Sequence, residues 1–199
     1  MRAGLETQRL FLRAFTRNDV DNLVELDSDP EVLRFINGGT PTPRSEIEER
    51  ILPWFLSFNA RPEGPGFLAA IEKATGEFVG WVSLRAEEGR DAHDLALGYR
   101  LKKKFWRKGY GTEMASALID KAFTEHAAER VFACTYSDNL ASRGVMEKCG
   151  MTLVRTYRMT AAELAEARTY VATDAAWPNG DVEYALDRAT WSLSREAHR

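Results

Sequence analysis

The sequence contains few of the residues that bind metals or form disulfides. Its 199 residues include two cysteines and three histidines, and Cys134 and Cys149 are too far apart for a CxxC motif. We therefore expect both thiols to be reduced, and the scattered histidines show no zinc-ligand spacing. No segment approaches the roughly 18 apolar residues that cross a bilayer, and residues 1–15 lack the apolar centre of a signal peptide. These absences predict a cytoplasmic protein that uses no metal.

The overall charge disfavours nucleic acid as a direct partner. The formal net charge is -3 and the sequence pI is about 5.7, whereas general nucleic-acid-binding domains usually carry a broad basic surface. Hydrophobic residues make up 44% and charged residues 29% of the chain, which is ordinary for a globular protein. The length fits one domain covering residues 1–199. We expect neither a membrane nor a nucleic acid as its partner.

Hydrophobic periodicity predicts hairpin strands in the first half of the chain and strand–helix units in the second. Thr16 is a plausible helix N-cap, Ser45 and Glu48 form a capping-box pattern, and Pro53 is expected to kink or split the helix that follows them. Strands are expected at 9–15, 66–74, 77–86, 94–101, 130–137, 151–159 and 181–188, and helices at 16–29, 30–35, 45–58, 112–126, 139–150 and 161–169. This order predicts an α/β protein of the mixed α+β kind, with helices on both faces of one sheet.

One stretch, KKKFWRKGYGTE at residues 102–113, is strongly basic within an acidic chain. A solvated basic turn is one interpretation. A nucleotide-binding loop is disfavoured, because GxxxxGK[ST] is absent and the third glycine of GxGxxG is replaced by Met114. A phosphate-binding loop of another type fits the order of strand, tight loop and helix start. Gly109 and Gly111 would let the backbone approach a ligand closely, and the helix dipole would attract an anion.

The segment LGYRLKKKFWRKGYGTEMASALIDKAF resembles the acyl-CoA-binding signature of the GNAT acetyltransferases. Trp106, Gly109 and Gly111 occupy the family's aromatic-x-x-Gly-x-Gly places, and NLASRGVMEKCGM is similar to its Asn-x-x-Ala/Ser helix and Glu-Lys-x-Gly turn. The nearest likeness is the branch of ribosomal-protein N-terminal (alanine/serine) acetyltransferases. The resemblance implies a mixed, mostly antiparallel twisted sheet of about seven strands, with helices on both faces and an acyl-CoA-binding core at about residues 94–151.

The same resemblance implies a site for acetyl-CoA. The pyrophosphate would rest on the amides of residues 107–112, and the pantetheine arm would pair with the strand end as an extra strand. Asn139, which is equally a helix N-cap, and Ser142 would face the thioester. The implied cofactor-binding residues are Tyr99, Arg100, Leu101, Trp106, Arg107, Lys108, Gly109, Tyr110, Gly111, Thr112, Asn139 and Ser142.

Two departures from the family pattern affect proton transfer. Relatives often carry a glutamate base where this chain has Ala96, and the nearest carboxylate on the same strand face is Asp94, which is either a base or an edge carboxylate. Many members use a tyrosine acid where this chain has Met146, and Ser142 would serve instead. Without a strong base, an α-amine of pKa near 8 is roughly 10% neutral at pH 7, against about 0.04% for a lysine side chain. The departures therefore mildly favour an α-amine or another amine of low pKa as the acceptor.

The expected activity is transfer of an acetyl group from acetyl-CoA to a primary amine by direct attack in a ternary complex. The acceptor is either a protein N-terminus or a small amine such as an antibiotic or a metabolite. A catalytically weak acyl-CoA sensor is an alternative that Ala96 and Met146 keep open. We expect the acceptor pocket near the first two helices, with Phe35, Trp54 and Trp177 as candidate lining residues. The resemblance makes a homodimer a reasonable expectation.

Overall fold

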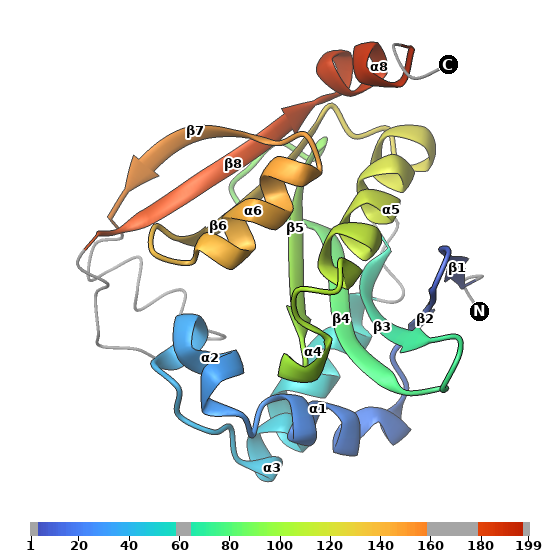
Figure 1. Cartoon of the computed structure of the whole chain (residues 1–199), viewed down its shortest axis with the longest axis vertical. Coiled ribbons are helices and arrows are strands. Elements are labelled where there is room, and N and C mark those ends of the chain that lie inside the picture. Colours follow the sequence, from blue (N-terminus) through green and yellow to red (C-terminus); the bar gives the residue numbers. More distant parts are fainter. Residues whose placement is uncertain (1–3, 59–64, 159–178, 197–199) are drawn as a thin grey trace.

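The computed structural model describes residues 4–58, 65–158 and 179–196. One eight-stranded sheet with the order β1-β2-β3-β4-β5-β6-β8-β7 runs through it (Figure 1). The strands are β1 Leu5–Glu6, β2 Leu10–Ala14, β3 Gly66–Glu72, β4 Phe78–Ala86, β5 Asp94–Leu101, β6 Arg130–Tyr136, β7 Thr152–Tyr157 and β8 Asp181–Asp187. The helices are η1 Arg17–Asp19, α1 Val20–Leu26, α2 Pro30–Asn37, α3 Arg44–Glu46, η2 Ile47–Ile51, α4 Leu52–Ser57, η4 Lys103–Phe105, α5 Tyr110–Glu125, α6 Leu140–Lys148 and α8 Arg188–Glu196.

The predicted fold class is confirmed. Neighbouring strands pair antiparallel throughout the sheet except for β5 and β6, which are parallel. The parallel pair is the one joined by α5, as a strand–helix–strand unit requires. The count of about seven strands was low by one, because the two-residue strand β1 was not predicted.

Two apolar layers hold helices on opposite faces of the sheet. Alternation along the strands places one set of side chains against α5 and α6, and the other set against α1, η2 and α4. The predicted apolar stripe of α5 is confirmed, since Met114, Leu118, Ala122 and Phe123 are all at most 2% exposed. On the opposite face, Phe55 and Phe67 stack with ring centroids 3.8 Å apart. The chain segment before β3 thus covers one face and the segment after β5 covers the other (Figure 1).

The caps and kinks of the first half were predicted in part. Thr16 does cap a helix, and its side chain forms a capping box with Asp19. The capping box at Ser45 and Glu48 is wrong, because the helix already begins at Arg44, after Pro43, with no side-chain cap. The expected disturbance at Pro53 takes the form of a π-helical turn, Ile47–Ile51, just before the proline. Proline has no backbone N–H to donate, and the wider π-helical turn before it adapts the helix to that missing hydrogen bond.

The C-terminal helix α8 was not predicted, and it packs Trp191 against Phe123 of α5. The helix expected at 161–169 lies outside the described residues. Within the described ranges, every helix is too short or too polar to cross a membrane.

Candidate active site

The sheet opens between the two parallel strands. Only residues 94–96 of β5 pair with residues 130–132 of β6. Beyond that point β6, β8 and β7 swing away from β5 (Figure 1). On its other edge β5 stays paired with β4 as far as Leu101. In the described parts of the chain, the last five residues of β5 therefore have no strand on the β6 side, and their backbone groups can bind an extended ligand there.

Helix α5 begins at this opening and offers free backbone donors. Its N-cap is Gly109, which adopts a left-handed conformation with a φ of 82°, and no side chain caps the helix. The first N–H groups of a helix have no intrahelical partner, and the dipole makes that end positive. By contrast α6, beside it, is capped by Asn139, whose Oδ1 accepts from the Ser142 N–H at 3.2 Å. The start of α5 is thus suited to an anion.

The basic residues before α5 fall into two groups. Lys102 is 7% exposed, and its Nζ lies 2.7 Å from Glu25 Oε2. Lys103 and Lys104 form ion pairs with glutamates of other elements. A solvated position is therefore wrong for Lys102, which is buried, whereas Lys103 and Lys104 are exposed and pair at the surface. In the described parts of the chain no ion pair involves Arg107 or Lys108, which are both exposed and stay available to an anion.

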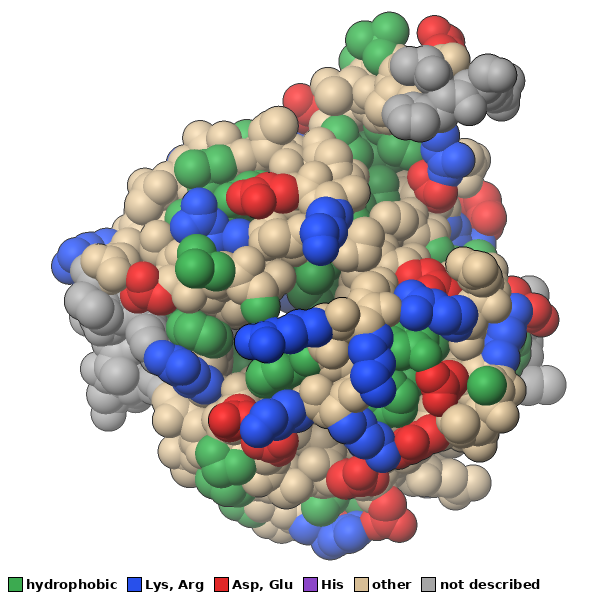
Figure 2. Space-filling view, viewed as in Figure 1, with side chains coloured by type: hydrophobic (Ala, Val, Ile, Leu, Met, Phe, Trp, Pro, Cys, Tyr) green, Lys and Arg blue, Asp and Glu red, His purple; other side chains and the backbone are tan. Residues whose placement is uncertain are grey.

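Basic side chains gather over the loop that precedes α5, beside a hollow in the face that carries α5 and α6 (Figure 2). Within this loop Arg107 has a φ of 60°, a conformation uncommon for residues other than glycine. Trp106 is 39% exposed, and its Nε1 donates to the carbonyl oxygen of Leu101 at 2.9 Å. That bond folds the indole back over the end of β5. The loop is thereby fixed to the strand that borders the opening.

Gly111 lies where α5 meets α6. A Cβ at this position would lie 3.3 Å from Val145 Cγ2 and 3.8 Å from Leu101 Cδ1. The helix start, the strand end and α6 therefore converge here with little spare room. Gly109 differs, because a Cβ added there would be close only to Arg9 Nη2, at 3.3 Å. A substitution at Gly109 would be costly mainly because its positive φ disfavours other residues.

A pair of hydroxyls connects β5 with α6. The Tyr99 hydroxyl oxygen lies 2.9 Å from the Ser142 carbonyl oxygen and 3.0 Å from Ser142 Oγ. Burial raises the pKa of Tyr99 well above its ordinary value, which outweighs the opposite effect of the hydrogen bond with Ser142. Tyr99 therefore stays protonated, and can donate a hydrogen bond, at every physiological pH. Sequence reasoning assigned Tyr99 only a backbone role, and the hydroxyl contact with Ser142 was missed.

The two departures from the family pattern lie in apolar surroundings. Ala96 is 4% exposed and packs in a small cluster with Phe132 and Ala185. Met146 is 2% exposed and belongs to the core beneath α5 and α6. Cys149 contacts Ser116 Oγ at 3.4 Å, and burial raises the pKa of its thiol. None of these three side chains is suited to carry a proton or to act as a thiolate nucleophile.

Asp94 lies at the opposite end of β5 from Tyr99. It is the first residue of that strand and lies opposite Arg130 of β6 in the strand register. Five residues of extended chain span roughly 16 Å, so a proton-transfer role for Asp94 stays a hypothesis that would need a chain of waters.

We expect Asp94→Asn to keep its acetyl-transfer rate within about twofold of the parent from pH 6 to pH 9, because general bases act within hydrogen-bond reach or through one water. The measurement is initial thiol release against pH. A loss concentrated at low pH would support the water relay instead.

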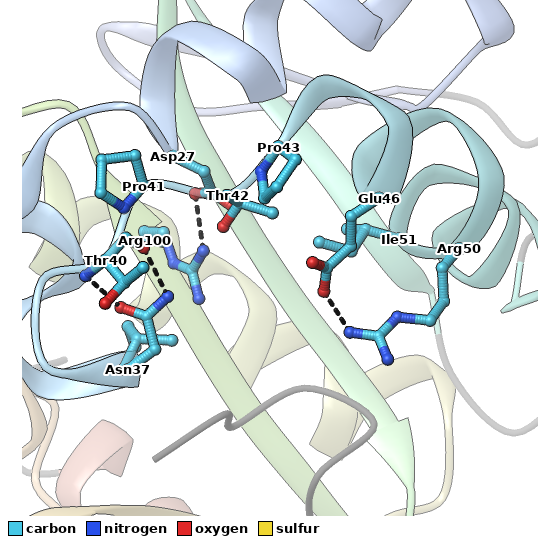
Figure 3. Close-up of a pocket in the computed structure, with 11 residues that line it drawn as sticks. Asp27, Asn37, Thr40, Pro41, Thr42, Pro43, Glu46, Arg50, Ile51 and Arg100 are labelled. Carbon is cyan, nitrogen blue, oxygen red and sulfur yellow. Dashed lines mark hydrogen bonds and ion pairs between the residues drawn. The ribbon is translucent and has the colours of Figure 1, made fainter.

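A cavity of about 150 Å³ lies between the end of α2 and the start of α3 (Figure 3). At its base Arg100 Nη1 donates to Asp27 Oδ1 at 2.6 Å, and both side chains are buried. The lining residues are Asp27, Ile36, Asn37, Thr40, Pro41, Thr42, Pro43, Glu46, Arg50, Ile51 and Arg100. The expected region near the first two helices is thus hollow, although the expected aromatic lining is not found there.

The aromatic residues expected around the acceptor have other places. Trp54 packs against Phe67, with ring centroids 4.9 Å apart, and against Phe58. Phe35 lies in α2 beside the cavity-lining Ile36 but is not among the lining residues. Trp177 lies outside the described residues. Trp54 is therefore better explained as part of the core than as part of a pocket.

A sheet that opens beside a glycine-containing loop and an uncapped helix is the arrangement expected of an acyl-CoA-dependent transferase. The acetyltransferase (GNAT) domain matches residues 9–152. The chain belongs to the GNAT family of acetyltransferases and is an enzyme of that class.

Relatives and solved structures agree with this assignment. The chain is 30% identical over 193 residues to FsC-acetyl coenzyme A-N(2)-transacetylase of Aspergillus fumigatus, covering 94% of this chain and 77% of that protein. A ribosomal alpha-N-protein acetyltransferase in complex with coenzyme A has the same fold, with a TM-score of 0.75 at 19% identity over 94% of this chain and 99% of that one. The structure of a ribosomal-protein-S5-alanine acetyltransferase from Vibrio fischeri matches with a TM-score of 0.69 at 15% identity, over 95% of this chain and 98% of that one.

Proposed function

We propose that this enzyme transfers the acetyl group of acetyl-CoA to a primary amine of low pKa, with an α-amine as the preferred acceptor. The observation that carries the proposal is the opening between β5 and β6 at the uncapped start of α5. Arg107 and Lys108 supply exposed positive charge at the same place, and neither forms an ion pair within the described ranges. These features fit an extended ligand that ends in phosphates.

The residues around the opening suit direct attack by the amine. Acetyl-CoA supplies the activated acyl group as a thioester. Tyr99 stays protonated, and its one hydroxyl hydrogen lies within reach of both the Ser142 carbonyl oxygen and Ser142 Oγ. When that hydrogen turns to Oγ, the serine hydroxyl hydrogen is free to point toward a departing sulfur. A thiolate with a pKa near 8.5 is already a fair leaving group, so one hydrogen bond stabilises it usefully. We propose Ser142 as the donor and Tyr99 as the group that orients it.

The apolar site at Ala96 supports the preference for an α-amine. Its neighbours Phe132 and Ala185 provide no group that accepts a proton. An acceptor that is already partly neutral at pH 7 needs the least help, and this favours α-amines over lysine side chains. A small-molecule amine is the second candidate, and the Aspergillus relative is named for acetyl transfer at an N(2) position.

A thiol-release screen tests the proposal. Peptides with N-terminal alanine or serine, polyamines and aminoglycosides would be offered with acetyl-CoA, and free coenzyme A would be measured. A matched pair of peptides separates the two amine classes: one has a free N-terminus and no lysine, and the other has a blocked N-terminus and one lysine.

We expect release with the free N-terminus, or with a small α-amine, to exceed release with the lysine peptide at least tenfold at pH 7. Release with the lysine peptide alone would contradict the preference. Tight binding of acetyl-CoA without release for any amine would favour the sensor. No rise in the melting temperature with saturating coenzyme A would overturn the cofactor site itself.

A further inference from the structure

The start of α5 is held from far away in the sequence by the turn between β1 and β2. Glu113, in the first turn of α5, accepts hydrogen bonds from Thr7 Oγ1 at 2.5 Å, from the Arg9 backbone N–H at 2.7 Å and from Arg9 Nε at 2.6 Å. The Glu113 side chain is 14% exposed. Burial alone would raise its pKa, but the bonds from Thr7 and Arg9 lower the pKa of Glu113, so the carboxylate is charged at neutral pH.

The guanidinium of Arg9 continues from this carboxylate to the loop. Its Nη1 donates to the Lys108 carbonyl oxygen at 2.8 Å. Its central carbon lies 4.2 Å from the centroid of the Tyr110 ring, which adds a cation–π contact. One side chain therefore touches the residues on both sides of Gly109.

The contact with Lys108 fixes the direction of a peptide group. In a trans peptide the C=O and the following N–H point in opposite directions. When Arg9 holds the Lys108 carbonyl on its own side, the Gly109 N–H must point away from Arg9. A phosphate-binding loop needs its N–H groups toward the anion and its carbonyl oxygens away from it. A free Lys108–Gly109 peptide could rotate and present the wrong end, since glycine tolerates many conformations.

We propose that Arg9 is a positioning residue for the cofactor, which orients the Lys108–Gly109 peptide of the phosphate-binding loop, and that Glu113 holds Arg9 in place. The inference rests on the proposed function, since it assumes that this loop binds the phosphates of acetyl-CoA. Arg9 acts through the loop backbone, and the affinity for phosphate-bearing ligands is what it controls.

Glu113→Gln gives a test in which a charge effect and a positioning effect change the affinity for acetyl-CoA in opposite directions. Removing a negative charge near a phosphate site would strengthen binding if charge alone mattered. Positioning predicts weaker binding, because a glutamine NH₂ cannot accept from Arg9 Nε and the guanidinium loses its anchor. We expect the Kd for acetyl-CoA, measured by calorimetry, to rise about five- to tenfold.

Arg9→Lys keeps the positive charge but loses the rigid guanidinium, whose Nε and Nη1 bind Glu113 and the Lys108 carbonyl oxygen at the same time, so we expect a similar rise in Kd. Pantetheine has no phosphate groups and serves as the second probe. The Kd for pantetheine, measured by competition, should be unchanged in both variants, because neither substitution alters the strand edge of β5. This difference between the two ligands would not result from a general loss of stability.

Arg13→Lys is the matched control. Arg13 lies on the same strand and makes a comparable ion pair, with Nη2 2.6 Å from Asp19 Oδ1, but it holds η1 and not the loop. We expect a lower Tm and an unchanged Kd for acetyl-CoA.

Acetyl-CoA affinity that is unchanged or stronger in folded Glu113→Gln and Arg9→Lys would overturn the inference while leaving the proposed function intact. Equal losses for acetyl-CoA and pantetheine would also overturn it. A parent chain that fails to bind acetyl-CoA would overturn the proposed function, and this inference with it.

Discussion

Gly111→Val is expected to weaken acetyl-CoA binding at least tenfold while leaving a folded protein. The φ of Gly111 is ordinary, so the substitution introduces no left-handed strain. Its first added carbon already lies 3.3 Å from Val145 Cγ2, and the two further methyl groups of valine must displace α6 or project into the site. Either result separates the start of α5 from its neighbours. A tenfold change corresponds to about 1.4 kcal/mol of binding free energy.

Gly111→Ala and Val145→Ala separate the two causes. Gly111→Ala should show a smaller loss, since its single carbon needs a shift of only a few tenths of an ångström. Combining it with Val145→Ala removes the opposing methyl groups. Recovery of affinity in the double variant would identify the contact with α6 as the cause. No recovery would indicate that the added carbon blocks the ligand directly. Parental affinity in folded Gly111→Val would refute the phosphate-binding loop.

Ser142→Ala is expected to lower kcat about tenfold and to leave the Kd for acetyl-CoA within twofold of the parent. The lost hydrogen bond to a developing thiolate is worth roughly 1–1.5 kcal/mol. The backbone N–H of residue 142 still donates to Asn139 Oδ1, and Tyr99 can still donate to the carbonyl oxygen of residue 142, so the local fold is retained. Single-turnover thiol release and calorimetry separate the two quantities.

Tyr99→Phe provides the test of coupling. If Tyr99 acts by orienting Ser142, the double variant Tyr99→Phe/Ser142→Ala should be no slower than Ser142→Ala alone. Once the serine hydroxyl is gone, Tyr99 has nothing left to orient. Because burial raises the pKa of Tyr99, its deprotonation should cause no fall in rate below pH 10. Full activity in Ser142→Ala would eliminate the serine as donor. Independent, multiplicative losses would assign Tyr99 a separate role.

The sequence allowed prediction of the features that depend on neighbouring residues. The apolar stripe from Met114 to Phe123 follows from helical spacing, and its burial agrees with that spacing. Asn139 was equally readable as a cap, because Asx side chains bond a backbone N–H two or three residues on. The capping box at Ser45 failed because Pro43 starts the helix earlier, and a local pattern cannot rank two competing starts.

Contacts between distant segments could not be read from spacing. The bonds from Thr7 and Arg9 to Glu113 span more than 100 residues, and strand β1, which leads into that turn, has only two residues. The Tyr99–Ser142 contact depends on how α6 packs against β5. The burial of Lys102 was hidden by the run of basic residues around it. In each case tertiary packing decided between alternatives that the local sequence left open.

The ion pairs at the end of β5 join the proposed cofactor site to the expected acceptor side. Arg100 and Lys102 reach Asp27 and Glu25, at the end of α1, and Arg100 also forms the base of the cavity beside α2. The strand that borders the cofactor opening is thus attached to the helices on the expected acceptor side. If the two sites are as proposed, a shift of α1 on acceptor binding would move the edge proposed for the pantetheine arm, and any coupling free energy would act equally in both directions.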